Sequence, residues 1–301
     1  MYVVRRIAYG FLVAWIVGLS LPLCSHATEK SSDKHFLWQV DSSTARVYLL
    51  GSIHVLREDA YPLAPVIEEA FASSDVLVLE ADVFSESRGE LMQSLTDYAT
   101  YPTGRTLKSE LSEPDYLKLI GMLLELGIPS QSVQQFRPWF ISLMAEQVVC
   151  NRLGWRPEYG IDVYFQTKAQ GQRDIEELES TEAQLEMLSS FSDQEGILML
   201  SWFMEDLSHS AQDFDELMQI WQHGDIQAME QELQEEIRDT PRFEPIWNIM
   251  VNDRNVGMAD RIIAYLASKK RYFVVVGSAH LVGPKGIVAL LQRRGYAVQQ
   301  L

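Results

Sequence analysis

The peptide Val47-Tyr48-Leu49-Leu50-Gly51-Ser52-Ile53-His54 is the most informative in the chain, because it joins an apolar β-type run to a glycine and then a histidine. The same order returns near the other end of the chain as Tyr272-Phe273-Val274-Val275-Val276-Gly277-Ser278-Ala279-His280. A glycine at a strand end permits a backbone turn, and the imidazole after it is placed at the sheet edge, where ligands bind. In either copy alone, the glycine could simply end a strand and the histidine could have a structural role. The recurrence instead predicts that His54 and His280 share one site.

Further strands are predicted near the first copy. Residues 36–40 and 46–50 flank the polar group Asp41-Ser42-Ser43-Thr44, which is typical of an antiparallel hairpin. After a helical stretch, the run Val76-Leu77-Val78-Leu79 predicts a strand that is buried on both faces and ends at Glu80.

The middle of the chain has a different pattern. Residues from about 86 to 269 show mainly helical periodicity, with one short strand predicted at 174–178. The strand at 272–276 follows, and residues 296–301 can return as a closing strand. Because strands lie at both ends and helices between them, the sequence predicts an α/β fold. Its mixed sheet is formed by the N- and C-terminal segments, and a large helical insertion covers about 86–269.

Residues 1–27 resemble a targeting segment and not part of the fold. Arg5 and Arg6 precede an apolar stretch, and Ser25-His26-Ala27 supplies small residues where a signal peptidase cleaves. We therefore expect an exported protein, periplasmic or secreted, that contacts a membrane only if this segment is retained as an anchor. Its removal takes away Cys24 and leaves Cys150 as the single cysteine, which excludes an intramolecular disulfide.

The chain is strongly acidic, with a formal net charge of −17 at pH 7. Such a field repels nucleic acid and concentrates cations near the surface. We therefore expect a peptide or small-molecule substrate and no nucleic-acid partner. The acidic excess lies largely between residues 176 and 244, on segments with helical periodicity, which is typical of solvated helix faces.

Glu80 is the first candidate for chemistry beside the two histidines. A carboxylate that ends an apolar strand must reach solvent, a hydrogen-bond donor or a metal ion, because burying it unpaired is costly. His54, Glu80 and His280 follow strand ends, so together they could bind a divalent transition metal of unknown identity with a position open to water. Without a metal, the same three groups could act as general acid and base.

Other polar residues have weaker signals. Arg137 precedes a helix start, where its guanidinium could pair with Glu80 or steady a developing oxyanion, or could only serve the helix junction. Glu179 ends the short strand and is a second choice for a general base. Asp162 is more readily explained as a negative charge in the first turn of a helix. Arg254 stands next to Asn255, and neither suits burial in a helix unless it is partnered.

These residues carry a resemblance to a known family. The ordered elements are Leu37-Trp38, Leu50-Gly51-Ser52-Ile53-His54, Leu79-Glu80, Tyr159-Gly160-Ile161-Asp162, Leu178-Glu179-Ser180 with Gln184, Trp221 with Gly224-Asp225, Arg254-Asn255 and Val276-Gly277-Ser278-Ala279-His280-Leu281-Val282-Gly283. Over residues 28–301 the chain resembles the TraB/GumN family. That family includes the Tiki proteins, described as metal-dependent proteases, and is similar in fold to the erythromycin esterase and ChaN-type haem-binding groups.

The resemblance implies an activity and a set of site residues. His54, Glu80 and His280 match the family's active-site positions, and Arg137, Glu179 and Arg254 match positions whose roles are less settled. Asp253 departs from the pattern, since the family more commonly carries Glu before Arg-Asn. The expected function is an exported, metal-dependent hydrolase that acts on a peptide or a related amide or ester. The alternatives are a metal-independent esterase-like enzyme and a non-catalytic haem or ligand binder.

Overall fold

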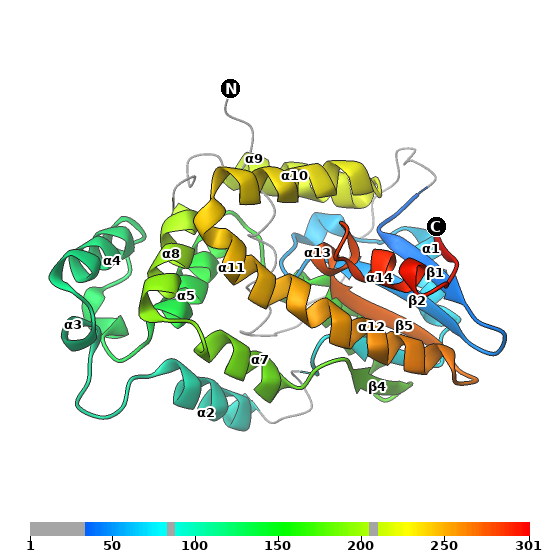
Figure 1. Ribbon diagram of the computed structural model, residues 1–301, viewed down its shortest axis with the longest axis horizontal. Coiled ribbons are helices and arrows are strands. Elements are labelled where there is room, and N and C mark those ends of the chain that lie inside the picture. The colour runs from blue at the N-terminus through cyan, green and yellow to red at the C-terminus, as the bar shows by residue number, and fades with distance from the viewer. Residues whose placement is uncertain (1–33, 83–87, 205–209) are drawn as a thin grey trace.

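A computed structural model describes residues 34–82, 88–204 and 210–301 of the chain. It is an α/β structure with a mixed six-stranded sheet, which confirms the predicted fold class (Figure 1). The strands are β1 (Leu37–Asp41), β2 (Arg46–Ser52), β3 (Val76–Leu79), β4 (Asp174–Glu177), β5 (Arg271–Gly277) and β6 (Val298–Gln300). The predicted signal segment, residues 1–27, lies outside the described residues.

The sheet has the strand order β4-β3-β5-β2-β1-β6. Strands β4, β3, β5 and β2 are parallel, whereas β1 forms the predicted antiparallel hairpin with β2 and also pairs antiparallel with β6. The C-terminal strand β5 therefore lies between two strands from the N-terminal part of the chain. This pairing brings the two ends of the sequence into one sheet, as the apolar runs predict.

Helices cover both faces of the central strands, which explains why those strands are continuously apolar. Neighbouring residues on β5 point to opposite faces. Phe273 packs against Phe71 of α1 (Pro65–Ala72) and Phe165 of α6 (Ile161–Ala169), with ring centroids 5.5 and 4.8 Å apart. Tyr272 stacks on Tyr265 of α12 (Asp253–Leu266), at 4.4 Å. Helices α1 and α6 thus lie on one face and α12 on the other.

The helical middle of the chain forms a second body of helices beside the sheet (Figure 1). Its remaining α-helices are α2 (Arg88–Ala99), α3 (Leu107–Glu110), α4 (Glu113–Glu125), α5 (Pro138–Arg152), α7 (Thr181–Ser189), α8 (Asp193–Met204), α9 (Ser210–Gln222), α10 (Ile226–Asp239) and α11 (Glu244–Trp247). The insertion is not purely helical, because β4 leaves it to pair with β3. It is therefore tied to the sheet in its middle as well as at its ends.

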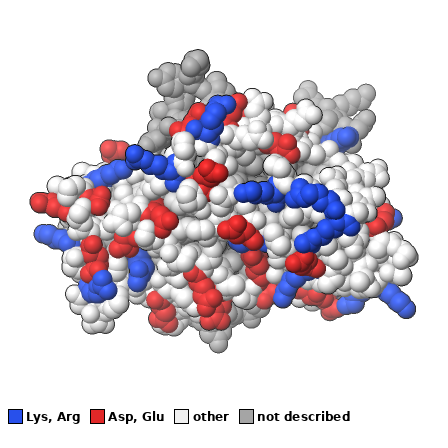
Figure 2. Space-filling view, in the orientation of Figure 1, with Lys and Arg blue, Asp and Glu red and all other residues white. Residues whose placement is uncertain are grey.

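The C-terminal part of the chain completes the second face. The short helix α13 (Ser278–Leu281) follows β5 directly, and α14 (Ile287–Arg293) packs against α12 and β6. On the face drawn in Figure 2, acidic and basic side chains are interspersed over the surface. Within the described ranges no helix has the length and apolar character needed to cross a membrane. Cys150 is buried and unpaired with another cysteine.

Candidate functional site

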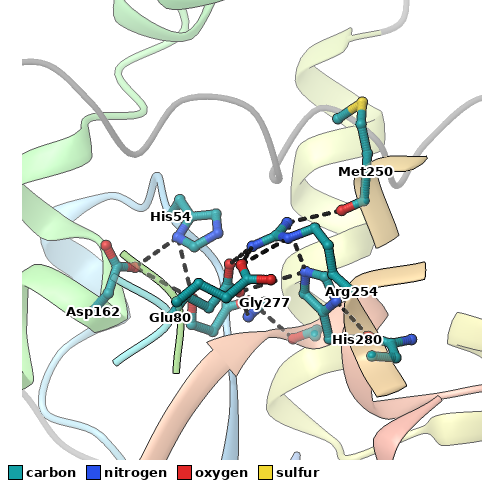
Figure 3. A network of polar contacts seen from close by, with 11 residues as sticks. His54, Glu80, Asp162, Met250, Arg254, Gly277 and His280 are labelled. Carbon is teal, nitrogen blue, oxygen red and sulfur yellow. Dashed lines mark hydrogen bonds and ion pairs between the residues drawn. The ribbon is translucent and has the colours of Figure 1, made fainter. Parts of the chain in front are cut away.

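The site lies at the carboxyl ends of three adjacent parallel strands. His54 follows β2, Glu80 follows β3 directly, and His280 belongs to α13 immediately after β5. Since β2 and β3 both pair with β5 in parallel, their carboxyl ends share one edge of the sheet. The structure brings these three predicted residues together there (Figure 3).

Glu80 is held by contacts to both of its oxygens. Oε1 accepts a hydrogen bond from the backbone N–H of Gly277 at 2.5 Å, and Oε2 accepts one from Nη2 of Arg254 at 2.9 Å. Burial alone would raise the pKa of the Glu80 carboxyl, but neighbouring groups, among them the Arg254 cation and the Gly277 N–H, lower it to about 2. Glu80 is therefore an ionised carboxylate fixed between the end of β5 and α12.

Arg254 is the centre of this polar network. Its Nε and Nη2 donate to Oε2 of Glu179 at 2.9 and 2.6 Å, and Nη2 also donates to Glu80. Nη1 donates to the carbonyl oxygen of Met250 at 2.8 Å and faces Nε2 of His280 at 3.3 Å. A guanidinium has five N–H groups, and five contacts are available for them. Burial would lower the pKa of Arg254, yet the two carboxylates raise it, so this group is a permanent cation.

The hydrogen bonds around His280 define its protonation. Nδ2 of Asn255 donates to the carbonyl oxygen of Lys285 at 3.0 Å, so the Asn255 side-chain oxygen is the acceptor for Nδ1 of His280 at 2.6 Å. Nδ1 therefore carries the hydrogen, and Nε2 accepts from Arg254. Burial lowers the pKa of His280 to about 3. At neutral pH this imidazole is neutral, and Arg254 is the cation that keeps Glu80 ionised.

His54 has a different partner. Its Nδ1 lies 2.9 Å from Oδ1 of Asp162, in the first turn of α6, and the Ser52 hydroxyl donates to the same carboxylate oxygen at 3.3 Å. Burial would lower the pKa of the imidazole, but the Asp162 carboxylate raises it above the ordinary value. In the neutral imidazole, Nδ1–H donates to Asp162 and Nε2 holds the lone pair. Nε2 has no hydrogen-bond partner within the described parts of the chain.

The network is nearly buried but reaches the surface through its acidic members. The side chain of His280 is 3% exposed and that of Glu80 is 13% exposed, whereas Asp162 and Glu179 are each 20% exposed. Asp162 and Glu179 are therefore the most exposed of these four side chains. The helical middle also closes over the strand ends, because Nε1 of Trp221 on α9 donates to the carbonyl oxygen of Gly51 at 2.6 Å.

Arg137 was a candidate to pair with Glu80, to steady an oxyanion or only to serve a helix junction. The structure places it at the start of α5, with its guanidinium 5.4 Å from the ring centroid of Tyr101. Arg254 makes the contact with Glu80 instead. The physical reason is that α5 packs against α8 within the helical body, away from the strand ends.

Asp162 and Asn255 were not among the predicted site residues, and Arg254 was named only through the resemblance, as a family position of less settled role. Asp162 looked like a helix-terminal charge, and Arg254 and Asn255 looked like helix residues in need of partners. The available signal was their polarity at positions with an apolar helical pattern. Asn255 is fully buried, and Arg254 is only 15% exposed along its side chain.

The predicted metal ligands do not form a metal site in this arrangement. Glu80 and His280 already accept hydrogen bonds from the Arg254 guanidinium, so of the three residues only His54 keeps a ring nitrogen, Nε2, open to a ligand. Within residues 34–82, 88–204 and 210–301, no group of three His, Cys, Asp or Glu side chains is placed to hold a metal ion. The donor set present therefore does not fit a divalent ion bound by His54, Glu80 and His280 together.

Comparison with known proteins agrees with the resemblance in the sequence. The chain is 26% identical over 264 residues to the uncharacterized protein YbaP of Escherichia coli (strain K12), covering 86% of this chain and 94% of that protein. It has the same identity and coverage to the uncharacterized protein YbaP of Shigella flexneri. No solved structure matches the chain significantly. The model of the TraB/PrgY/gumN family matches residues 36–300, from β1 to β6, so the chain belongs to this family.

Proposed function

We propose that this protein is an exported hydrolase that cleaves a peptide or a related amide or ester. The observation that carries the proposal is the His54–Asp162 pair, in which Nδ1 is bonded to a carboxylate and Nε2 is left without a partner in the described structure. An imidazole oriented in this way is the usual general base of hydrolytic sites. It lies beside a fixed carboxylate and a permanent cation.

The geometry suggests direct attack by water. Nε2 of His54 takes a proton from water as the water oxygen bonds to the substrate carbonyl carbon. Asp162 stabilises the imidazolium that forms, and the same nitrogen then gives its proton to the departing nitrogen or oxygen. Ser52 is a poor nucleophile here, because its buried hydroxyl lies on the Nδ1 side and donates to Asp162.

The other residues of the network have supporting roles in this proposal. Glu80 fixes the end of β5 through Gly277 and, with Glu179, holds Arg254. Glu179 is a weaker candidate for the base than His54, because its Oε2 accepts twice from a guanidinium. His280 is held neutral between Asn255 and Arg254 and is a structural partner of that cation.

Two alternatives predict different behaviour. A metal-dependent form of the reaction would use His54, Glu80 and His280 as ligands and would lose activity on chelation. A haem binder would use the histidines as axial ligands, but both ring nitrogens of His280 are engaged in hydrogen bonds. The haem alternative is therefore the less favoured, and the absence or presence of a Soret band on mixing with haem tests it.

The decisive experiment compares two carboxylate variants on a fluorogenic peptide and ester library. Asp162→Asn keeps the shape of the side chain but removes the charge that orients and stabilises His54, so we expect turnover to fall by about 10²- to 10⁴-fold. The turnover of the His54→Ala variant should fall at least as far. The matched control is Asp253→Asn, an exposed carboxylate adjacent to Arg254, which should keep the parent activity. Full activity of Asp162→Asn would rule out His54 as the base.

A further inference from the structure

The groups around Arg254 are those that usually surround a metal ion. Two carboxylates, one imidazole nitrogen and one backbone carbonyl oxygen converge on the guanidinium, from Glu80, Glu179, His280 and Met250. Carboxylate, imidazole and carbonyl are all common ligands of divalent cations. We infer that the Arg254 guanidinium takes the place of a divalent metal ion in this site, so the protein binds no metal ion there and acts without one.

The first support is that Glu80 and His280 direct toward the Arg254 guanidinium the atoms with which they would bind a metal ion. Oε2 of Glu80 lies 2.9 Å from Nη2 of Arg254, and Nε2 of His280 lies 3.3 Å from Nη1. The second oxygen of Glu80 accepts from the Gly277 N–H. A divalent ion could bind Glu80 and His280 only after Arg254 had withdrawn, and it would otherwise lie next to a like charge.

The second support is that Arg254 is anchored and cannot withdraw cheaply. Its donor Nη1 is fixed on the carbonyl oxygen of Met250, which lies in a π-helical turn (Asn248–Asn252) immediately before α12. A π turn changes the carbonyls available to the following residues and is common at functional sites. Movement of the guanidinium would also leave Glu80 and Glu179 nearly buried without a compensating charge, which is strongly unfavourable.

The third support comes from the neighbour of Arg254 on the same helix. Asn255 accepts from Nδ1 of His280 and so turns Nε2 toward Arg254. The backbone carbonyl of Lys285 fixes the orientation of Asn255 in turn. Consecutive residues of α12 thus hold both nitrogens of His280, which keeps the imidazole directed at the guanidinium and away from any exogenous ligand.

A consequence is that removing the guanidinium should create a metal site. Arg254→Ala would leave two carboxylates and the Nε2 lone pair of His280 facing a space that the cation had filled. We expect untagged wild-type protein to retain no Co²⁺ after equilibration and desalting. We expect Arg254→Ala to retain about one ion per chain, with the visible absorption of Co²⁺ bound to protein nitrogen and oxygen.

Controls separate this effect from general loss of structure. Arg261→Ala removes an exposed arginine from the same helix and should gain no Co²⁺. Arg254→Lys keeps a cation at the position and should also bind none. The double variant Arg254→Ala with Glu80→Gln should lose the ion that Arg254→Ala gains. Circular dichroism spectra of each variant check that it is folded.

The wild-type measurement tests the inference even if Arg254→Ala does not fold. Stoichiometric Co²⁺ binding by the wild type, abolished by Glu80→Gln or His280→Ala, would overturn it. The inference concerns the same site as the proposed hydrolysis, but its readout is metal content and not activity. An inactive wild type that binds no Co²⁺ would contradict only the proposed function. An active wild type that chelation silences and a divalent ion restores would contradict only the inference.

Discussion

The two histidines of the repeated Gly-Ser-x-His sequence have opposite surroundings at the residue scale. His54 faces the carboxylate of Asp162, which raises the pKa of the imidazole in spite of its burial. His280 is buried against Asn255 and Arg254, and its pKa is lowered to about 3. His54 therefore takes up a proton more readily than an ordinary imidazole, and His280 stays neutral. The same local sequence gives different chemistry because the partners come from other elements.

Glu146 is a buried acid outside this network. It lies on α5 with 2% exposure, and its Oε1 has no hydrogen-bond partner in the described structure. Burial raises the pKa of this carboxyl well above its ordinary value. The folded state thus keeps the proton over a pH range in which the unfolded chain has lost it. In that range the stability of the protein must fall as pH rises.

We predict that Glu146→Met stabilises the protein increasingly as the pH is raised. Above the unfolded pKa of a glutamate, about 4.3, the wild type loses up to about 1.4 kcal/mol of unfolding free energy per pH unit until the folded pKa is reached. Methionine fills a similar volume without a titratable group, so it removes this loss. Urea unfolding between pH 5 and 8 measures the difference. Glu125→Met, at an exposed position of α4, is the control. If the unfolding free energies of Glu146→Met and the wild type differ by the same amount at every pH, the prediction is contradicted.

At the scale of elements, the approach of α6 to the β2 end sets the His54–Asp162 contact. Gly160 is the N-cap of α6, and a Cβ atom there would lie 2.3 Å from the His54 carbonyl oxygen. The N–H of Ile161 also donates to the Ile53 carbonyl oxygen at 3.2 Å. The absence of a side chain at Gly160 therefore lets the first turn of α6, with Asp162, lie directly against the segment that carries His54.

We predict that Gly160→Ala reduces both stability and activity. The methyl group must push α6 from the His54 segment, which should cost about 1–3 kcal/mol of unfolding free energy and lengthen the His54–Asp162 bond. Thermal unfolding and turnover on the same peptide substrate measure the two effects. Gly257→Ala is the matched control, because Gly257 lies on α12 with open space around its Cβ position. The Gly257→Ala variant should be as stable as the parent or more stable by up to about 1 kcal/mol. If Gly160→Ala has the stability and activity of the parent, the packing argument is contradicted.

At the scale of the whole molecule, the C-terminal segment joins the parts of the sheet. Strand β5 pairs with β2 on one side and β3 on the other, so β3 and β4 reach the β1–β2 hairpin only through it. Strand β6 adds an edge beside β1. The site has the same dependence, because His54, Glu80 and His280 come together only when β5 is in place.

We predict that truncation after Lys270 abolishes folding, whereas truncation after Ala297 does not. The first removes the central strand β5, and the second removes only the edge strand β6 with a few hydrogen bonds such as that from Leu301 N–H to the Leu37 carbonyl oxygen. Circular dichroism and thermal unfolding compare both with the full chain. The shorter truncation should melt cooperatively at a lower temperature. Cooperative unfolding of the chain truncated after Lys270 would show that the N-terminal part forms a stable unit without β5.

The sheet and the positions of three site residues could be predicted from the amino-acid sequence. Continuous apolar runs before His54, Glu80 and His280 predict buried parallel strands, and parallel strands end at one edge. The helical middle and the short strand at 174–178 were also predictable, because their periodicities differ from those of the flanking strands.

The contacts of these residues could not be predicted, because they depend on how the helices pack against the sheet. Asp162 lies 108 positions from His54, and Arg254 lies 174 positions from Glu80. Both are on helices, where a polar residue faces the solvent or the site according to how the helix is rotated against the sheet. That rotation is set by packing of the whole helix, so local spacing does not encode it. For the same reason the sequence named Arg137, at a helix start, as a possible partner of Glu80 and did not pair Arg254 with it.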